Sequence, residues 1–161
     1  MRRPRAASAT LLLALLAAGC GPPAQSATPV ASRHTDPTTE RVKAELTSAF
    51  NMSFEPAGPH HELGKAPDGV QLDLVGVPPE ELVLSLPAGE RAAAVASGLA
   101  YLPHLRDLLH GADPVWDWTA AMLACRREAG ASCDNERSQG NLTARFPDDD
   151  PDYIVLVITR R

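Results

Sequence analysis

Alternating hydrophobic and polar residues predict two neighbouring strands in the middle of the chain. Apolar and polar residues alternate along Val70–Val77, and the alternation resumes over Glu81–Leu86 after Pro78 and Pro79. Because successive side chains of a strand point to opposite faces, each run offers one apolar face to a core. Two such runs joined by a short proline-containing turn are typical of an antiparallel hairpin.

Two further strands are predicted near the C-terminus. Asn141–Phe146 alternates in the same way, and Pro147–Asp152 forms a polar turn after it. Tyr153–Ile158 is apolar at every position. A strand that is apolar on both faces is usually central in its sheet and covered on both sides.

Apolar residues at spacings of three and four predict three helices. Asp36 and Pro37 form an N-cap followed by a proline in the first turn, and Asp113-Pro114 repeats this pattern before a helix that ends at Gly130. A helix over Glu90–Gly111 lies between them. Pro103 should kink or split it, because proline removes a backbone hydrogen bond and clashes with the preceding turn.

The predicted order of elements is α-β-β-α-α-β-β, which indicates a single α+β domain over residues 38–161. We expect a small, mainly antiparallel sheet with the helices packed on it. Asn51–Gly69 contains several prolines and is expected to be irregular, with at most a short strand near Phe54.

The first residues of the chain have the pattern of a secretory signal peptide. The chain begins with MRRPR, and Ala6–Ala18 then carries no charged residue. This apolar run is shorter than the roughly 20 residues that span a bilayer. A basic start, a short apolar middle and a small-residue end predict that residues 1–19 are a removable leader.

The end of this leader, Leu16-Ala17-Ala18-Gly19-Cys20, resembles the lipobox of bacterial lipoproteins. The resemblance implies that the thiol of Cys20 receives a diacylglycerol and that Cys20 becomes the first residue. Ala17 stands where leucine is usual, so ordinary cleavage after Ala18 or Gly19 is the alternative. Two acyl chains, such as palmitate, hold a protein firmly on a membrane, which implies a lipid anchor on the extracytoplasmic face of the cell membrane.

The segment after Cys20 is predicted to be a tether. Gly21–Pro37 contains almost no large apolar residue, so it cannot bury enough surface to fold. A flexible coil of about 17 residues spans roughly 20–25 Å. Residues 20–37 are therefore expected to join a lipidated cysteine to the folded domain.

The charge of the chain excludes a nucleic-acid partner. The leader contains three of the 15 lysines and arginines and none of the 20 acidic residues, so 12 basic and 20 acidic residues remain, a formal charge of −8. Such a surface repels nucleic acid and anionic headgroups. Only 4% of the residues are aromatic, too few to form a stacking platform for bases.

Cys125 and Cys133 remain if Cys20 is lipidated. In an exported protein such a pair is most simply a disulfide. A metal or redox pair is the alternative, although the spacing is neither C-x-x-C nor a zinc pattern.

Adjacent histidines, His60 and His61, are weak candidates for metal binding. A zinc-protease helix needs a second histidine four residues after the first, and Lys65 stands at that distance from His61. A solvated loop explains the stretch as well, and we expect no cofactor.

Two tryptophans, Trp116 and Trp118, lie two residues apart in the third predicted helix. Such residues point about 200° away from each other. Trp118 shares a face with Met122 and Cys125, so Trp116 is the candidate for an exposed, partner-binding residue. The alternative is a helix covered on two sides, with Trp116 packed beneath a loop.

Together these patterns predict a lipid-anchored protein of the bacterial cell envelope whose acidic domain is a non-enzymatic protein-interaction module. The expected partner is another envelope protein. The alternative is a small extracytoplasmic hydrolase or metal-binding enzyme that uses carboxylates or a metal near His60 and His61. A ligand-binding lipoprotein ranks third, because the domain is too small for two lobes around a cleft.

Overall fold

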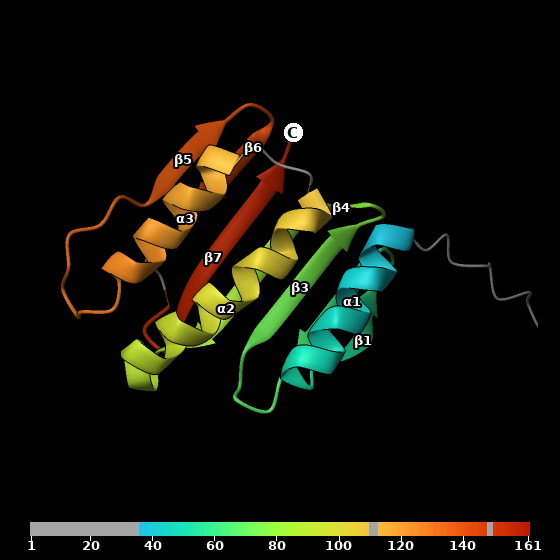
Figure 1. Cartoon of the computed structure of the whole chain (residues 1–161), viewed down its shortest axis with the longest axis horizontal. Helices are drawn as coiled ribbons and strands as arrows, with labels where there is room; N and C mark the ends of the chain where they lie inside the picture. Colours follow the sequence, from blue (N-terminus) through green and yellow to red (C-terminus); the bar gives the residue numbers. More distant parts are fainter. Residues whose placement is uncertain (1–35, 110–112, 148–149) are drawn as a thin grey trace, which may run out of the picture. The chain divides into compact units, whose positions relative to one another are not determined.

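A computed structural model describes residues 36–109, 113–147 and 150–161. Within these residues a seven-stranded antiparallel sheet carries three α-helices on one face (Figure 1). The predicted α+β class is confirmed. Cys20, the predicted leader and most of the predicted tether lie outside the described residues. In the described part, no helix has the length and apolar character needed to cross a membrane.

The described elements follow one another as α-β-β-β-β-α-α-β-β-β, with a short 3₁₀ helix, η1, before the second α-helix. Their bounds are α1 (Pro37–Phe50), β1 (Ser53–Gly58), β2 (His61–Lys65), β3 (Gln71–Gly76), β4 (Pro79–Pro87), η1 (Ala88–Glu90), α2 (Arg91–Leu109), α3 (Asp113–Cys125), β5 (Glu136–Gln139), β6 (Leu142–Arg145) and β7 (Tyr153–Arg160).

The strands form two antiparallel meanders within one sheet of order β1-β2-β3-β4-β7-β6-β5. The predicted hairpin is β3 and β4, in which Leu72 lies opposite Leu84. β7 pairs with β4 on one side and with β6 on the other, so it is central, as predicted. The helices lie on one face only, so the cover expected on both sides of β7 is helical on one side alone (Figure 1). On the other face, Val157 lies between Val83 and Arg145 of the neighbouring strands and is nevertheless buried.

Two strands, β2 and β5, were not predicted, whereas β1 corresponds to the short strand allowed near Phe54. β1 and β5 are the two edges of the sheet, and most of their side chains are exposed, so their sequences show no alternation between core and solvent. In β2, Gly64 lies so close to β1 that an added Cβ would be 2.7 Å from both Met52 and Phe54. The segment expected to be irregular therefore contains a hairpin whose pattern is concealed by glycines and prolines.

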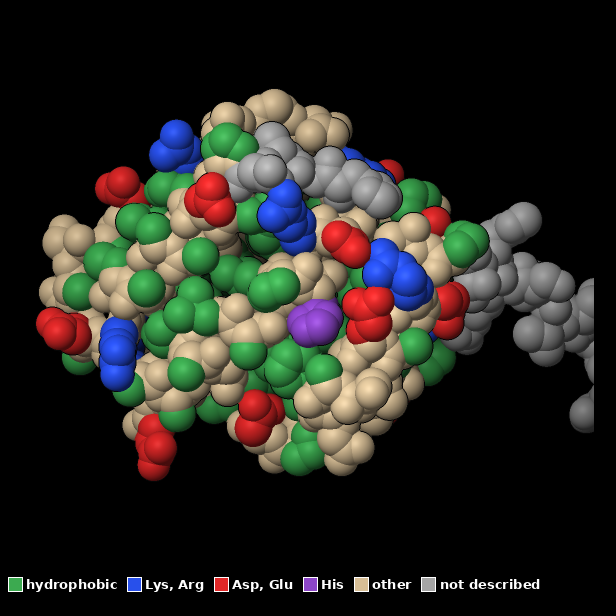
Figure 2. All heavy atoms as spheres, in the orientation of Figure 1, with side chains coloured by type: hydrophobic (Ala, Val, Ile, Leu, Met, Phe, Trp, Pro, Cys, Tyr) green, Lys and Arg blue, Asp and Glu red, His purple; other side chains and the backbone are tan. Residues whose placement is uncertain are grey.

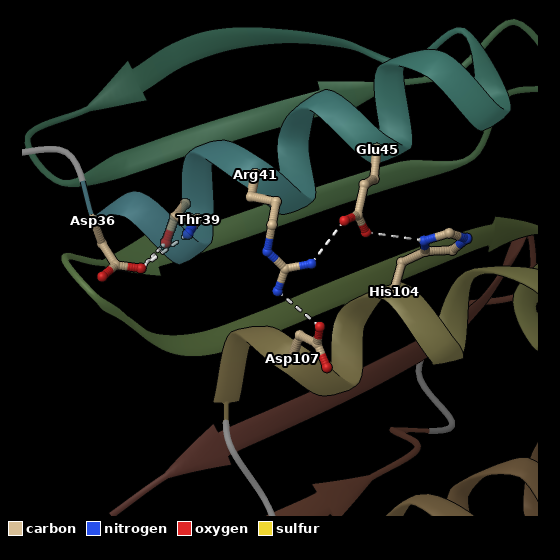
Figure 3. Close-up of polar contacts among 6 residues, drawn as sticks. All are labelled: Asp36, Thr39, Arg41, Glu45, His104 and Asp107. Carbon is tan, nitrogen blue, oxygen red and sulfur yellow. Dashed lines mark hydrogen bonds and ion pairs between the residues drawn. The ribbon is translucent and has the colours of Figure 1, made fainter.

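The first helix begins as predicted, at Asp36. The carboxylate of Asp36 accepts hydrogen bonds from the backbone N–H and the hydroxyl of Thr39, both at 2.9 Å (Figure 3). This cap satisfies a backbone donor that the first turn leaves free. Val42 and Leu46 are fully buried one helical turn apart and fix the face of α1 that packs on the core.

A continuous helix, α2, passes through Pro103, so of the two predicted effects, a kink or a split, the split does not occur. Proline removes its own N–H and displaces the carbonyl of the residue four positions earlier, which is Leu99. Both Pro103 and Leu99 are exposed. Water can therefore satisfy the freed carbonyl, which makes the proline tolerable on this side of the helix.

The third helix ends at Cys125, five residues before the predicted end at Gly130. The chain tightens there into a turn in which the N–H of Arg126 donates to the carbonyl of Leu123 at 3.1 Å. Cys125 and Cys133 form the predicted disulfide, with their Cα atoms 6.1 Å apart. This bond ties the following loop to the end of α3.

An exposed polar cluster joins α1 to α2 (Figure 3). The guanidinium of Arg41 donates to Glu45 at 2.7 Å and to Asp107 at 2.8 Å, and the other oxygen of Glu45 lies 3.5 Å from Nδ1 of His104. The hydrogen bonds to Asp107 and Glu45 raise the pKa of Arg41. Charged side chains of both signs lie side by side on this face of the molecule (Figure 2). Such exposed pairs contribute little to stability but favour one alignment of the two helices.

One core side chain, Tyr101 of α2, is buried together with its hydroxyl. Its ring stacks on Phe50 of α1, with the ring centroids 4.0 Å apart. The hydroxyl has no hydrogen-bond partner among the described residues. Burial, and secondarily the charge of Asp68, raises the pKa of Tyr101 to about 12. The ring therefore acts as a neutral packing element.

Close packing at Gly98 brings α2 against both the sheet and α3. A Cβ added at Gly98 would lie 2.6 Å from a methyl carbon of Leu86 in β4 and 2.7 Å from one of Leu123 in α3. All of these positions are buried. A larger side chain at this position would therefore have to displace the side chains of Leu86 and Leu123.

We predict that Gly98→Val lowers the free energy of unfolding by about 2 kcal/mol, because extra methyl groups strain a filled core. Urea denaturation measures the change. Gly89→Val is the matched control, because nothing lies within 4 Å of a Cβ built at Gly89. It should change stability by no more than about 0.5 kcal/mol. Equal effects of the two substitutions would contradict the packing argument.

Candidate functional site

A hollow of about 550 Å³ lies at the end of the sheet where α1 begins. In Figure 3, Asp36 marks this end of α1, close to the turns that join β1 to β2 and β3 to β4. Both turns and the first turn of α1 contribute to the walls. The lining residues are Asp36, Thr39, Glu40, Pro56, Ala57, Gly58, Pro59, His60, His61, Glu62, Leu74, Gly76, Val77 and Pro79.

The two strand turns that form the walls are bonded to each other. The backbone N–H of Gly76 donates to the carbonyl of His60 at 2.8 Å. Gly76 has a φ of 100°, and an added Cβ would lie 2.9 Å from the carbonyl oxygen of Pro78, so this position requires glycine. His60 also has a positive φ, of 56°. The walls of the hollow are therefore fixed by the backbone.

The hollow has a buried apolar base and an exposed rim. Leu74 and Pro79 are buried beneath it, whereas Val77 on the rim is 44% exposed. Pro56 and Ala57 add further apolar surface from β1. Sites for small ligands are typically concave, largely apolar and about 300–1,000 Å³ in volume. This hollow has the size and character of such a site.

The charged groups of the hollow are acidic. Asp36, Glu40 and Glu62 line it, and no lysine or arginine stands among the described lining residues. Lys43 of α1 lies behind them, 3.0 Å from Glu40 and 2.7 Å from Glu62. Partial burial opposes the charge of Lys43, but its hydrogen bonds to Glu62 and Glu40 outweigh this, and the pKa of Lys43 is raised. The ammonium group of Lys43 is thus shared by two carboxylates, those of Glu40 and Glu62.

The two histidines that sequence analysis singled out both reach the hollow, but not as a pair of ligands. His60 lies in the β1–β2 turn, and Nε2 of His61 lies 2.7 Å from a carboxylate oxygen of Asp73 in β3. Among the described residues, no group of three or more histidine, cysteine, aspartate or glutamate side chains is arranged to hold a metal ion. The geometry gives these histidines a place in the wall of the hollow.

The predicted exposure of Trp116 is wrong. Its side chain is only 5% exposed and belongs to the core, together with Val115, Thr119 and Leu123 of the same helix. α3 packs beside α2 and over the β5–β6 hairpin, so the stripe through Trp116 and Leu123 faces inward. Trp118 lies at the flank of this stripe, 6.1 Å from the ring of Phe146. The alternative, a helix covered on two sides, accounts for both tryptophans.

Both edges of the sheet discourage the addition of another strand. The outer strand β1 contains Pro56, and its pairing with β2 shifts between Pro56 and Gly58. The other edge, β5, is four residues long and begins with Glu136 and Arg137. Proline, irregular pairing, short length and charge all disfavour pairing with a further strand. A partner would therefore have to be recognised through side chains.

Sequence analysis missed most of the hollow, because its walls come from segments that carry no regular pattern. Pro56–His60 falls in the stretch expected to be irregular, whereas Gly76 and Val77 end a predicted strand and Pro78 and Pro79 form the predicted turn. The dense glycines and prolines of these stretches mark tight turns. Nothing in the linear sequence indicates that the two turns meet beside Asp36.

Comparisons with protein-family models, with curated proteins and with solved structures found no match for this chain. No residue role is thus carried over from another protein. The function proposed below depends on the residues and geometry of this chain.

We predict that Lys43→Gln lowers the free energy of unfolding by about 1 kcal/mol, more at low salt, because it leaves Glu40 and Glu62 facing each other without a cation. Lys65→Gln is the matched control. Lys65 is also paired with a glutamate, Glu55, but its side chain is 52% exposed, compared with 15% for Lys43. Urea denaturation at two salt concentrations compares the variants. An equal decrease in the free energy of unfolding for Lys43→Gln and Lys65→Gln would contradict a special role for Lys43.

Proposed function

We propose that this chain is a lipid-anchored protein of the bacterial cell envelope, held on the extracytoplasmic face of the membrane through Cys20, and that its folded domain is a non-enzymatic interaction module. The resemblance of Leu16–Cys20 to a lipobox supports the anchor. The hollow beside Asp36 supports the binding role and is the observation that carries the proposal.

The bonding of the ionisable groups in the hollow favours recognition over acid–base chemistry. The carboxylate of Asp36 caps α1, and Glu40 and Glu62 share Lys43. His61 is held by Asp73. A general acid or base needs a proton that it can exchange with a substrate, whereas these groups already have structural partners. They are better suited to holding the walls of the site in place.

The position of the hollow along the chain connects it to the anchor. Asp36, which lines the hollow, is about 16 residues after Cys20, and a flexible segment of that length spans roughly 20–25 Å. The hollow therefore stays close to the membrane surface if Cys20 is lipidated. A partner in or on the same membrane could reach it.

We predict that Cys20→Ser moves the protein from the membrane fraction to the soluble fraction and removes the mass of the lipid, because the acylated thiol is the anchor. Cell fractionation and intact-mass spectrometry measure both effects. Ala17→Leu is the control, since it restores the usual residue of the lipobox and should leave the protein on the membrane. Continued membrane association of Cys20→Ser, with an unchanged mass, would refute the anchor.

We predict that a photo-crosslinking residue at Val77, on the rim of the hollow, forms a discrete adduct in native membranes. The same probe at Leu99 should form none. Both side chains are similarly exposed, at 44% and 36%, but Leu99 lies on α2 and does not line the hollow. Blocking the hollow with Ala57→Trp should abolish the adduct at Val77. Equal labelling from Val77 and Leu99, or an adduct that survives Ala57→Trp, would refute the hollow as the binding site.

A further inference from the structure

We infer that the occupant of the hollow is an extended segment of a partner protein in which a lysine or arginine stands beside apolar residues. This inference rests on the proposed function and names the partner chemistry of the same site. It follows from the apolar base, the fixed walls, the charge of the lining and the bonding at the start of α1.

The shape of the hollow selects a few side chains of a partner. Leu74 and Pro79 form a buried apolar base, and Val77 extends the apolar surface to the rim. The backbone bond between Gly76 and His60 holds the two wall turns together. A hollow of about 550 Å³ is large enough for several side chains but not for a folded domain. An apolar segment would bury its side chains there without reordering the site.

The charge of the hollow selects a cation next to those apolar side chains. Two glutamates that line the hollow, Glu40 and Glu62, share a single ammonium group, that of Lys43, which is not among the described lining residues. Lys43 neutralises only part of this charge. A lysine or arginine on the occupant would lie beside the two glutamates that line the hollow, so opposite charges would meet.

The start of α1 does not favour an anion instead. A free helix N-terminus attracts anions through its unbonded N–H groups. Here the carboxylate of Asp36 already accepts from the N–H and the hydroxyl of Thr39, at 2.9 Å each. An anionic headgroup or phosphate would have to displace Asp36 and approach Glu40. The chain also carries a formal charge of −8 without its leader, which repels an anionic membrane surface.

The test uses the full-length protein purified from membranes in detergent and a phage library of random octapeptides as the probe. We expect the selected peptides to combine lysine or arginine with neighbouring apolar residues and to contain few acidic residues. Binding of a selected peptide should weaken as the salt concentration rises, because the attraction is partly electrostatic. Ala57→Trp should abolish binding, whereas Ala93→Trp, at an exposed position on α2, should not.

Two glutamates of α1 provide the decisive comparison. Glu40 lines the hollow and pairs with Lys43, whereas Glu45 lies outside the hollow and pairs with Arg41. Glu40→Gln should lower the affinity for a selected basic peptide by about fivefold, which is the effect of losing one charge pair near the surface. Glu45→Gln should leave its affinity unchanged. A peptide in which the basic residue is replaced by glutamine should bind equally to the wild type and to Glu40→Gln.

The outcomes separate this inference from the proposed function. Enrichment of basic residues, together with weaker binding to Glu40→Gln alone, supports the inference. If the selected peptides are apolar or acidic and Ala57→Trp blocks their binding, the inference of a basic occupant is overturned. The proposal that the domain is an interaction module then stands. A Val77 adduct with the chain's own residues 21–35, or with lipid, would overturn a partner segment as the occupant. Selection of no peptide, together with no adduct at Val77, would overturn both proposals.

Discussion

Seven consecutive residue pairs between β4 and β7 hold the two halves of the sheet together. Without this ladder, the meander β1–β4 and the meander β5–β7 would share no backbone hydrogen bonds. The ladder also aligns Leu82, Leu84 and Leu86 with the buried side of β7, and burying each such side chain contributes about 1.5–3 kcal/mol. α2 packs on this surface at Gly98, and α1 and α3 pack against α2. The helical layer thus depends on the same ladder.

The hollow is a consequence of how the first meander and α1 meet. Antiparallel strands return to the same end of the sheet at every second turn, so the β1–β2 and β3–β4 turns are neighbours. Lys43 holds the start of α1 over β2 through Glu40 and Glu62. Because the backbone bond between Gly76 and His60 fixes the walls, a ligand would lose little free energy to ordering the site.

The lipid anchor that we propose and a site of this kind would complement each other physically. Confining a domain and its partner to the same membrane raises their effective concentration, so that a small contact suffices for binding. Neither edge of the sheet favours the addition of a strand, and Trp116 is buried in the core. The hollow is therefore the surface with the clearest binding character in the described part of the chain. Its acidic lining and apolar base together define the chemistry of a suitable occupant.

The sequence by itself determined the features that depend on residues close together in the chain. The alternation along Val70–Leu86 predicted β3 and β4, Asp36 predicted the start of α1, and the Cys125–Cys133 pair predicted the disulfide. Only the tertiary structure decided which strands form the edges, that Trp116 faces inward, and that two turns meet beside α1 to form a hollow. Edge strands bury few side chains and so leave no periodic pattern. A helix face becomes core, and turns become a site, only through neighbours that are distant in sequence.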